Sequence, residues 1–174
     1  MKEFSIIADA EIAGPDAVHE RYGLQDREGI DAAIERSRGP IVVWGDDRLV
    51  STLADSAIRL RQSVELVPMP VGSYRSLWRS TGLPSKPARA LKRVEKGDVR
   101  FRPMNTMRIS DSSKPRAFHG FSFGAGTIYR LFDAHRLAGA SDEALTSRAP
   151  QLFKELAQRG PRFLESVDGR LTID

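Results

Sequence analysis

An apolar run that leads directly into a glycine turn constrains this chain more than any other feature. Ile41–Trp44 is followed by Gly45–Arg48, and residues 49–60 then have the pattern of a helix. Buried parallel strands deliver their carboxyl ends to a ligand crevice in this way in open α/β sheets. A second site of the same kind follows, where residues 64–67 lead into Gly72-Ser73. Two strand-to-glycine turns of this kind predict a phosphate or nucleotide site.

The rest of the pattern predicts an α/β fold: an open, mostly parallel sheet with flanking helices, followed by a small β-rich part. We expect a first domain over residues 1–97 and a second over 98–174. Apolar runs indicate strands, and apolar residues at helical spacing indicate helices. The expected strands are 4–8, 41–44, 64–67, 99–101, 106–109 and 117–122, with a hairpin over 162–173. The expected helices are 28–37, 49–60, 74–81, 85–95, 127–137 and 141–159.

Composition excludes several classes of function. The 174 residues, 40% of them hydrophobic, suffice for one compact domain or slightly more. The chain has no cysteine, which excludes disulfides, thiolate zinc sites and thiol catalysis. The apolar run near the N-terminus is too short for a signal peptide, and no run approaches the roughly 20 apolar residues of a membrane-spanning helix. We therefore expect a cytoplasmic protein, with peripheral membrane attachment as an alternative.

The net charge of +4 is unevenly distributed: residues 75–116, called here the basic band, carry twelve cations against only Glu95, Asp98 and Asp111. A band of this kind attracts phosphates, anionic lipid head groups or nucleic acid, although it is also compatible with a solvated basic face. Aromatic residues are not interleaved through it as a base-stacking platform requires, so nucleic acid is the weaker expectation. Its cations are Arg75, Arg79, Lys86, Arg89, Lys92, Arg93, Lys96, Arg100, Arg102, Arg108, Lys114 and Arg116.

The two glycine turns are the candidate anion sites. At Gly45 the amides of a helix N-terminus could hold a phosphate, but Asp46 and Asp47 place two carboxylates at the same spot. These carboxylates could instead bind Mg²⁺ or cap the following helix. At Gly72-Ser73, Arg75 and Arg79 lie one helical turn apart and could clamp a phosphate, or they could be ordinary surface arginines. His19 and His135 have no metal-ligand spacing, and His119 is more typical of a packed or edge histidine than of a catalyst.

The order of these turns resembles the diacylglycerol kinase catalytic domain, which is shared with sphingosine kinases and other lipid kinases. The family's Gly-Gly-Asp-Gly-Thr pattern falls on Trp44–Arg48. Its Pro-Leu-Gly-Thr-Gly-Asn-Asp-Phe-Ala-Arg run falls on Pro70–Arg79, and its Leu-Gly-Ile-Pro on Thr81–Pro84. The family's Gly-Phe-Asp segment falls within residues 118–126, so the likeness spans roughly residues 28–130.

The resemblance implies ATP-dependent phosphorylation of a lipid hydroxyl with Mg²⁺ as cofactor. It implies a nucleotide site formed by Gly45, Asp46, Arg48, Gly72, Ser73 and Arg75, with Asp46 as the metal ligand. The cations that would face substrate phosphate or an anionic membrane are Arg79, Lys86, Arg89, Lys92 and Arg93. No residue is assigned as the catalytic base.

The departures from the family pattern predict an eroded site and weak or absent kinase activity. Trp44, Asp47 and Tyr74 replace glycines whose backbone amides approach the ATP phosphates in the family, and Asp47 adds a negative charge beside phosphate. The β-rich part is also expected to be shorter than in these kinases. The competing interpretation is a non-catalytic module that binds an anionic ligand, a membrane surface or a protein partner through the basic band. A third is a pseudoenzyme that forms a homo-oligomer or pairs with a complete homologue through the strand edge at 162–173.

Overall fold

The computed structural model describes residues 4–16, 18–72, 74–110 and 116–121, together with Pro150, Lys154 and Gln158. The chain forms two compact units, residues 1–121 and 122–174, so the expected boundary at residue 97 falls within the first unit. The described elements belong to that first unit. The helices and hairpin expected after residue 122 lie outside the described residues.

A four-stranded parallel sheet is the centre of the first unit. Its strands are β1 (Ser5–Asp9), β2 (Glu20–Tyr22), β3 (Ile41–Trp44) and β4 (Leu66–Pro68). They lie in the order β2-β1-β3-β4, and each neighbouring pair is parallel. The sheet confirms the expected α/β class, and the carboxyl ends of β1, β3 and β4 therefore meet at one edge.

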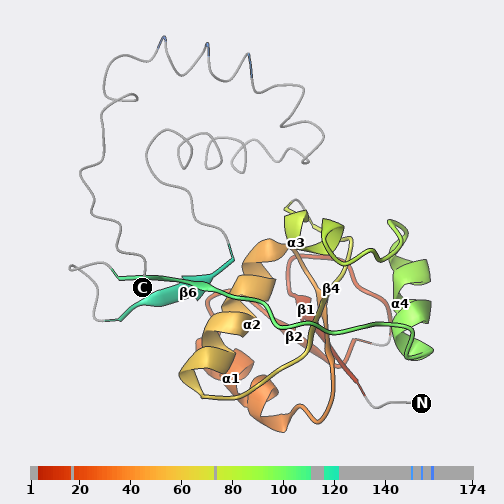
Figure 1. Ribbon diagram of the computed structural model, residues 1–174, viewed down its shortest axis with the longest axis horizontal. Helices are drawn as coiled ribbons and strands as arrows, with labels where there is room; N and C mark the ends of the chain where they lie inside the picture. The colour runs from red at the N-terminus through yellow and green to blue at the C-terminus, as the bar shows by residue number, and fades with distance from the viewer. Residues whose placement is uncertain are drawn as a thin grey trace. The chain divides into compact units, whose positions relative to one another are not determined.

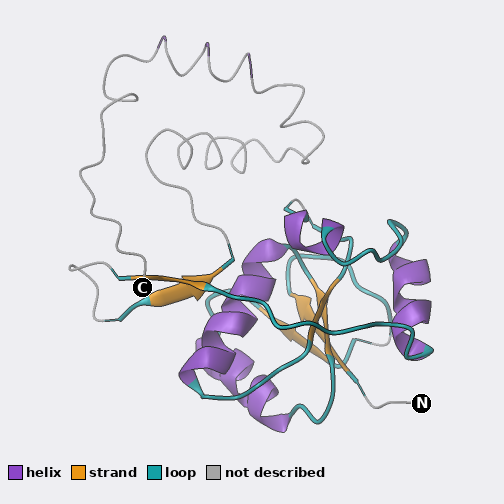
Figure 2. Ribbon diagram, in the orientation of Figure 1, coloured by secondary structure: helices purple, strands orange, loops and turns teal. Residues whose placement is uncertain are grey.

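Helices cover both faces of this sheet (Figure 1). On one face lie α1 (Arg27–Arg36) and α2 (Asp47–Arg59), which also pack against each other. On the other face lies α4 (Pro87–Glu95), and the short helix α3 (Ser76–Arg79) follows the β4 turn. The helix–sheet–helix layering is visible in Figure 2.

The alternation of side chains along β3 produces the two cores. Ile41 and Val43 pack under α1 and α2, whereas Val42 and Trp44 pack under α4. All four side chains are buried, as expected for a central strand covered on both sides. The Trp44 indole also donates a hydrogen bond to the Ala13 carbonyl at 2.9 Å, which attaches the loop after β1 to the end of β3.

Two elements differ from the sequence expectation. Residues 20–22 form β2, where no strand is expected from the sequence, and residues 99–101 form no strand although one is expected. β2 has no apolar alternation because its sequence is Glu-Arg-Tyr and it lies at the sheet edge. The expected strands at 106–109 and 117–122 are present as β5 (Met107–Ile109) and β6 (Phe118–Gly120), which form an antiparallel pair.

The opposite edge of the sheet, β4, ends in a proline. Ile41 donates its amide to the Glu65 carbonyl, and the Met69 amide donates to the Val43 carbonyl, so these odd-numbered residues face β3. Leu66 and Pro68 therefore direct their backbone to the free edge. Pro68 has no amide hydrogen to offer there, and proline in sheets is largely confined to such edge positions. In the part of the chain that the structure describes, no helix is long and apolar enough to cross a bilayer.

Candidate functional site

The two glycine turns meet at the carboxyl edge of the sheet, as the parallel order of β3 and β4 predicts. A Cβ on Gly72 would lie 2.7 Å from the Asp46 Cβ and 3.1 Å from the Asp46 nitrogen. Gly72 also has a φ of +81°, which favours glycine. A Cβ on Gly45 would lie 2.7 Å from Leu49 Cδ2 and 3.4 Å from the Asp9 Cβ. Both glycines therefore permit a close approach of the backbone.

Asp46 caps α2 and pairs with Arg48. Its side chain is 1% exposed, and its Oδ1 accepts a hydrogen bond from the Arg48 amide at 3.0 Å. The Arg48 guanidinium binds the same carboxylate through Nε and Nη2, at 2.9 Å and 2.8 Å from Oδ2. The helix-capping alternative for Asp46 is therefore what the structure shows. The charge of Arg48, expected to attract a nucleotide, is directed at Asp46.

The amides at the start of α2 already have acceptors within the chain. The Asp47 amide donates to the Tyr74 carbonyl at 2.8 Å, and the Arg48 amide donates to the Asp46 side chain. The Leu49 and Val50 amides donate to the Asp46 carbonyl. A helix N-terminus binds phosphate through amides that have no other acceptor. The geometry at Gly45 thus leaves little hydrogen-bonding capacity for an anion.

The Asp47 side chain forms hydrogen bonds with the following helix, α3, rather than with its own helix, α2. Its carboxylate accepts hydrogen bonds from the Ser76 amide at 2.7 Å, from the Ser76 hydroxyl and from the Leu77 amide at 3.2 Å. Burial raises the pKa of Asp47, and these hydrogen bonds with α3 partly offset that effect. The second carboxylate of the turn therefore connects α2 with α3.

The residues at this edge do not fit a magnesium–nucleotide group. Asp9 and Asp46 are both buried at the ends of neighbouring strands, but Asp9 accepts the Glu11 amide at 3.0 Å and Asp46 is neutralised by Arg48. Among the described residues, no group of three or more acidic or histidine side chains could hold a metal ion. Ser73 lies outside the described residues. Arg75 is half-buried at the start of α3, and Arg48 lies 6.0 Å from the centre of the Tyr74 ring.

The expected anion-binding cations lie on exposed surfaces, with one exception. Arg79, Lys86, Arg89 and Lys92 are exposed. Arg93 instead pairs with Asp98 at 2.8 Å. α4 begins at Pro87 and buries Ala90 and Val94 against the sheet, so its exposed cations point away from the core.

A polar cluster around Asp55 was not predicted from the sequence. Asp55 lies on α2 and is 4% exposed, and its carboxylate accepts the His119 amide at 3.0 Å. The His119 Nδ1 lies 3.0 Å from the same oxygen, while Arg27 lies 3.1 Å and Arg116 3.8 Å from the other. One carboxylate thus connects α1, α2 and β6. The one feature of the sequence that could have indicated this cluster is Asp55 itself, an acidic residue among the apolar positions of the expected helix.

Comparison of the chain with models of known protein families, with curated proteins and with solved structures found no match. The fold defines the class of protein, a three-layer α/β domain with a parallel sheet.

Proposed function

We propose that this chain is a lipid-kinase-like domain without a working nucleotide site, and that it acts as a non-catalytic module which docks on anionic membrane surfaces. The kinship is supported by the order of the two turns and by the close approach of Gly72 to Asp46. The absence of catalysis is supported by the amides and carboxylates of the turn, which are engaged with Tyr74, Arg48 and Ser76.

The observation that carries the docking function is the cationic face of α4. Successive residues of a helix are separated by about 100°, so side chains three or four apart share a face. Arg89, Lys92 and Lys96 follow this spacing and are exposed, while Ala90 and Val94 are buried on the other side. Lys86, which is also exposed, lies at the N-cap just before this face begins. None of these four cations forms an ion pair with a described residue.

Four such charges suit reversible membrane attachment. Each lysine or arginine near an anionic surface contributes about 1 kcal/mol, so four give on the order of 4 kcal/mol, or a roughly millimolar dissociation constant. Salt weakens this attraction because the Debye length is about 10 Å at 0.1 M ionic strength.

The test is sedimentation of the full chain with vesicles of phosphatidylcholine alone or mixed with phosphatidylserine. We expect binding only to the mixed vesicles, with loss of binding in high salt. The double variant Lys86→Gln/Lys92→Gln should bind several-fold more weakly. Arg38→Gln/Arg61→Gln is the matched control, because both side chains are exposed, form no ion pair with described residues and follow α1 and α2 instead. Equal loss in both variants, or equal binding to both kinds of vesicle, would contradict the proposal.

A further inference from the structure

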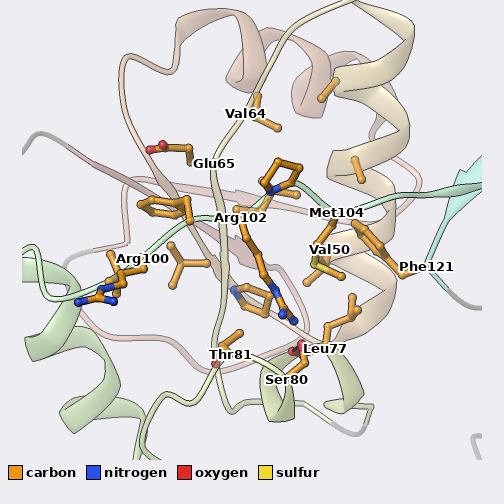
Figure 3. A pocket seen from close by; sticks show the side chains of 18 of the residues that line it. Val50, Val64, Glu65, Leu77, Ser80, Thr81, Arg100, Arg102, Met104 and Phe121 are labelled. Atoms are coloured by element: carbon orange, nitrogen blue, oxygen red, sulfur yellow. Dashed lines mark hydrogen bonds between the residues drawn. The ribbon is translucent and has the colours of Figure 1, made fainter.

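A cavity of about 910 Å³ lies beside the open edge of the sheet within the first unit. It is bounded by α2, by β4 and the residues before it, by the end of α3, and by the extended segment of residues 98–106 (Figure 3). Cavities of roughly 300–1,000 Å³ accommodate small organic ligands.

Apolar and polar side chains contribute comparable areas to the wall of the cavity, and the apolar ones gather along α2 and β4. Val50, Ala54 and Ala57 of α2 form one side, and β4 contributes Leu66 and Val67. Three large hydrophobic side chains are exposed to solvent at the same cavity: Ile58 and Phe101 at 39% and Met104 at 50%. Exposed apolar surface gathered in a concavity marks a place where an apolar group would be stabilised by leaving water.

An arginine crosses the cavity. The Arg102 side chain extends from the 98–106 segment toward Leu77 and Ser80 at the end of α3 (Figure 3). It forms no ion pair with any residue that the structure describes. Arg93, which also lines the cavity, is by contrast bound to Asp98. An anionic group at Arg102 would gain a charge-assisted hydrogen bond that the protein does not supply itself.

We infer that this cavity binds an anionic single-chain amphiphile, with its apolar chain against α2 and β4 and its head group on Arg102. An extended peptide suits the cavity less well, since the edge it would pair with is three residues long and ends at Pro68. The inference goes beyond membrane docking by α4 and does not depend on it.

Titration calorimetry with laurate, below its micellar concentration, tests the inference directly. Dodecyl maltoside and dodecyltrimethylammonium serve as the neutral and cationic counterparts, with alkyl chains of nearly the same length. The variants are Arg102→Gln for the head group and Ile58→Asp for the wall. Arg108→Gln is the matched control, because Arg108 is exposed on the neighbouring β5 and does not line the cavity. Circular dichroism checks that each variant is folded.

We expect one laurate per chain, with affinity about tenfold lower in Arg102→Gln, the loss of one charge-assisted contact. Arg108→Gln should bind as the unaltered chain does, and the folded Ile58→Asp variant should bind no laurate. The Lys86→Gln/Lys92→Gln variant should retain full laurate affinity, which separates this site from the docking surface. Equal affinity for laurate and the cationic amphiphile would overturn the inference. Laurate binding by Ile58→Asp with unchanged affinity would also overturn the inference. A decrease in laurate binding as the chain self-associates would do so too, because it would mean that a second copy of the chain occupies the cavity.

Discussion

Gly72 lies directly against Asp46, so close that a Cβ on the glycine would approach the Asp46 Cβ to 2.7 Å. The loop after β4 therefore passes over the turn after β3 only because residue 72 has no side chain. The two turns are then joined by hydrogen bonds, from the Asp47 amide to the Tyr74 carbonyl and from the Ser76 amide to the Asp47 carboxylate.

Gly72→Ala should lower the free energy of unfolding by about 2–4 kcal/mol, the sum of a left-handed backbone penalty and a steric one. Gly82→Ala is the matched control, because Gly82 has a φ of +72° but nothing lies within 4 Å of its Cβ position. In Gly82→Ala the free energy of unfolding should fall only by the left-handed backbone penalty, about 1 kcal/mol. Urea denaturation measures both, and equal losses would mean that the contact with Asp46 is not tight.

Magnesium–ATP should not bind at the glycine turns. The Asp47 and Arg48 amides have acceptors in the chain, and Arg48 neutralises Asp46. Titration with up to millimolar ATP should therefore leave the fluorescence of Trp44 and Trp78 without a saturable change. Saturation at micromolar to low millimolar ATP would instead favour an active lipid kinase.

Asp55→Asn should destabilise the fold by about 2 kcal/mol, because the buried carboxylate loses its charge-assisted hydrogen bonds while the partly exposed Arg27 remains in contact with water. The variant weakens the attachment of both Arg27 and His119 to α2. Asp98→Asn is the control, since the Asp98–Arg93 pair is exposed and should contribute little to stability. Chemical denaturation compares them, and similar losses would argue against a structural role for the Asp55 cluster.

Asp31 should contribute stability that disappears in acid. Burial alone raises the pKa of Asp31, but hydrogen bonds from Arg59 and Ser56, with the charge of Arg59, lower it below its ordinary value. A depressed pKa in the folded state means that the contribution is present above the unfolded pKa of about 3.9 and is lost as pH falls through the lower folded value.

The stability difference between the unaltered chain and Asp31→Asn should therefore be constant near neutral pH. It should be about 0.5–1 kcal/mol there, because the Asp31–Arg59 pair is partly exposed. The difference should shrink below pH ~4. Glu35→Gln, an exposed change on the same helix, should show no such trend. A difference that grows in acid would contradict the sign of the effect.

The sequence predicts the elements whose periodicity is set by burial. Ile41–Trp44 is fully apolar because β3 is covered on both faces, and Ile30, Ala33 and Ile34 mark the buried side of α1. The meeting of Gly45 and Gly72 is also predictable, since parallel strands bring their carboxyl ends together. β2 is not, because its pairing with β1 depends on backbone hydrogen bonds rather than on apolar side chains.

The partners within the site depend on contacts that are distant in the sequence. The Asp47 carboxylate binds Ser76, which is 29 residues away, and Asp55 binds His119 across 64 residues. No local pattern specifies these pairs. The cavity likewise arises where the 98–106 segment passes β4 without forming the expected strand, and a sequence pattern does not show a space between two elements.

Pro68, at the end of β4, makes this edge of the sheet less able than the β2 edge to pair with an additional strand. A strand arriving beside Pro68 would find a carbonyl but no amide hydrogen, whereas β2 at the opposite edge is Glu-Arg-Tyr and contains no proline. If two copies of this domain ever share a continuous sheet, they should therefore join through β2. The β4 edge is instead suited to contact with a small molecule bound in the cavity rather than to pairing with another strand.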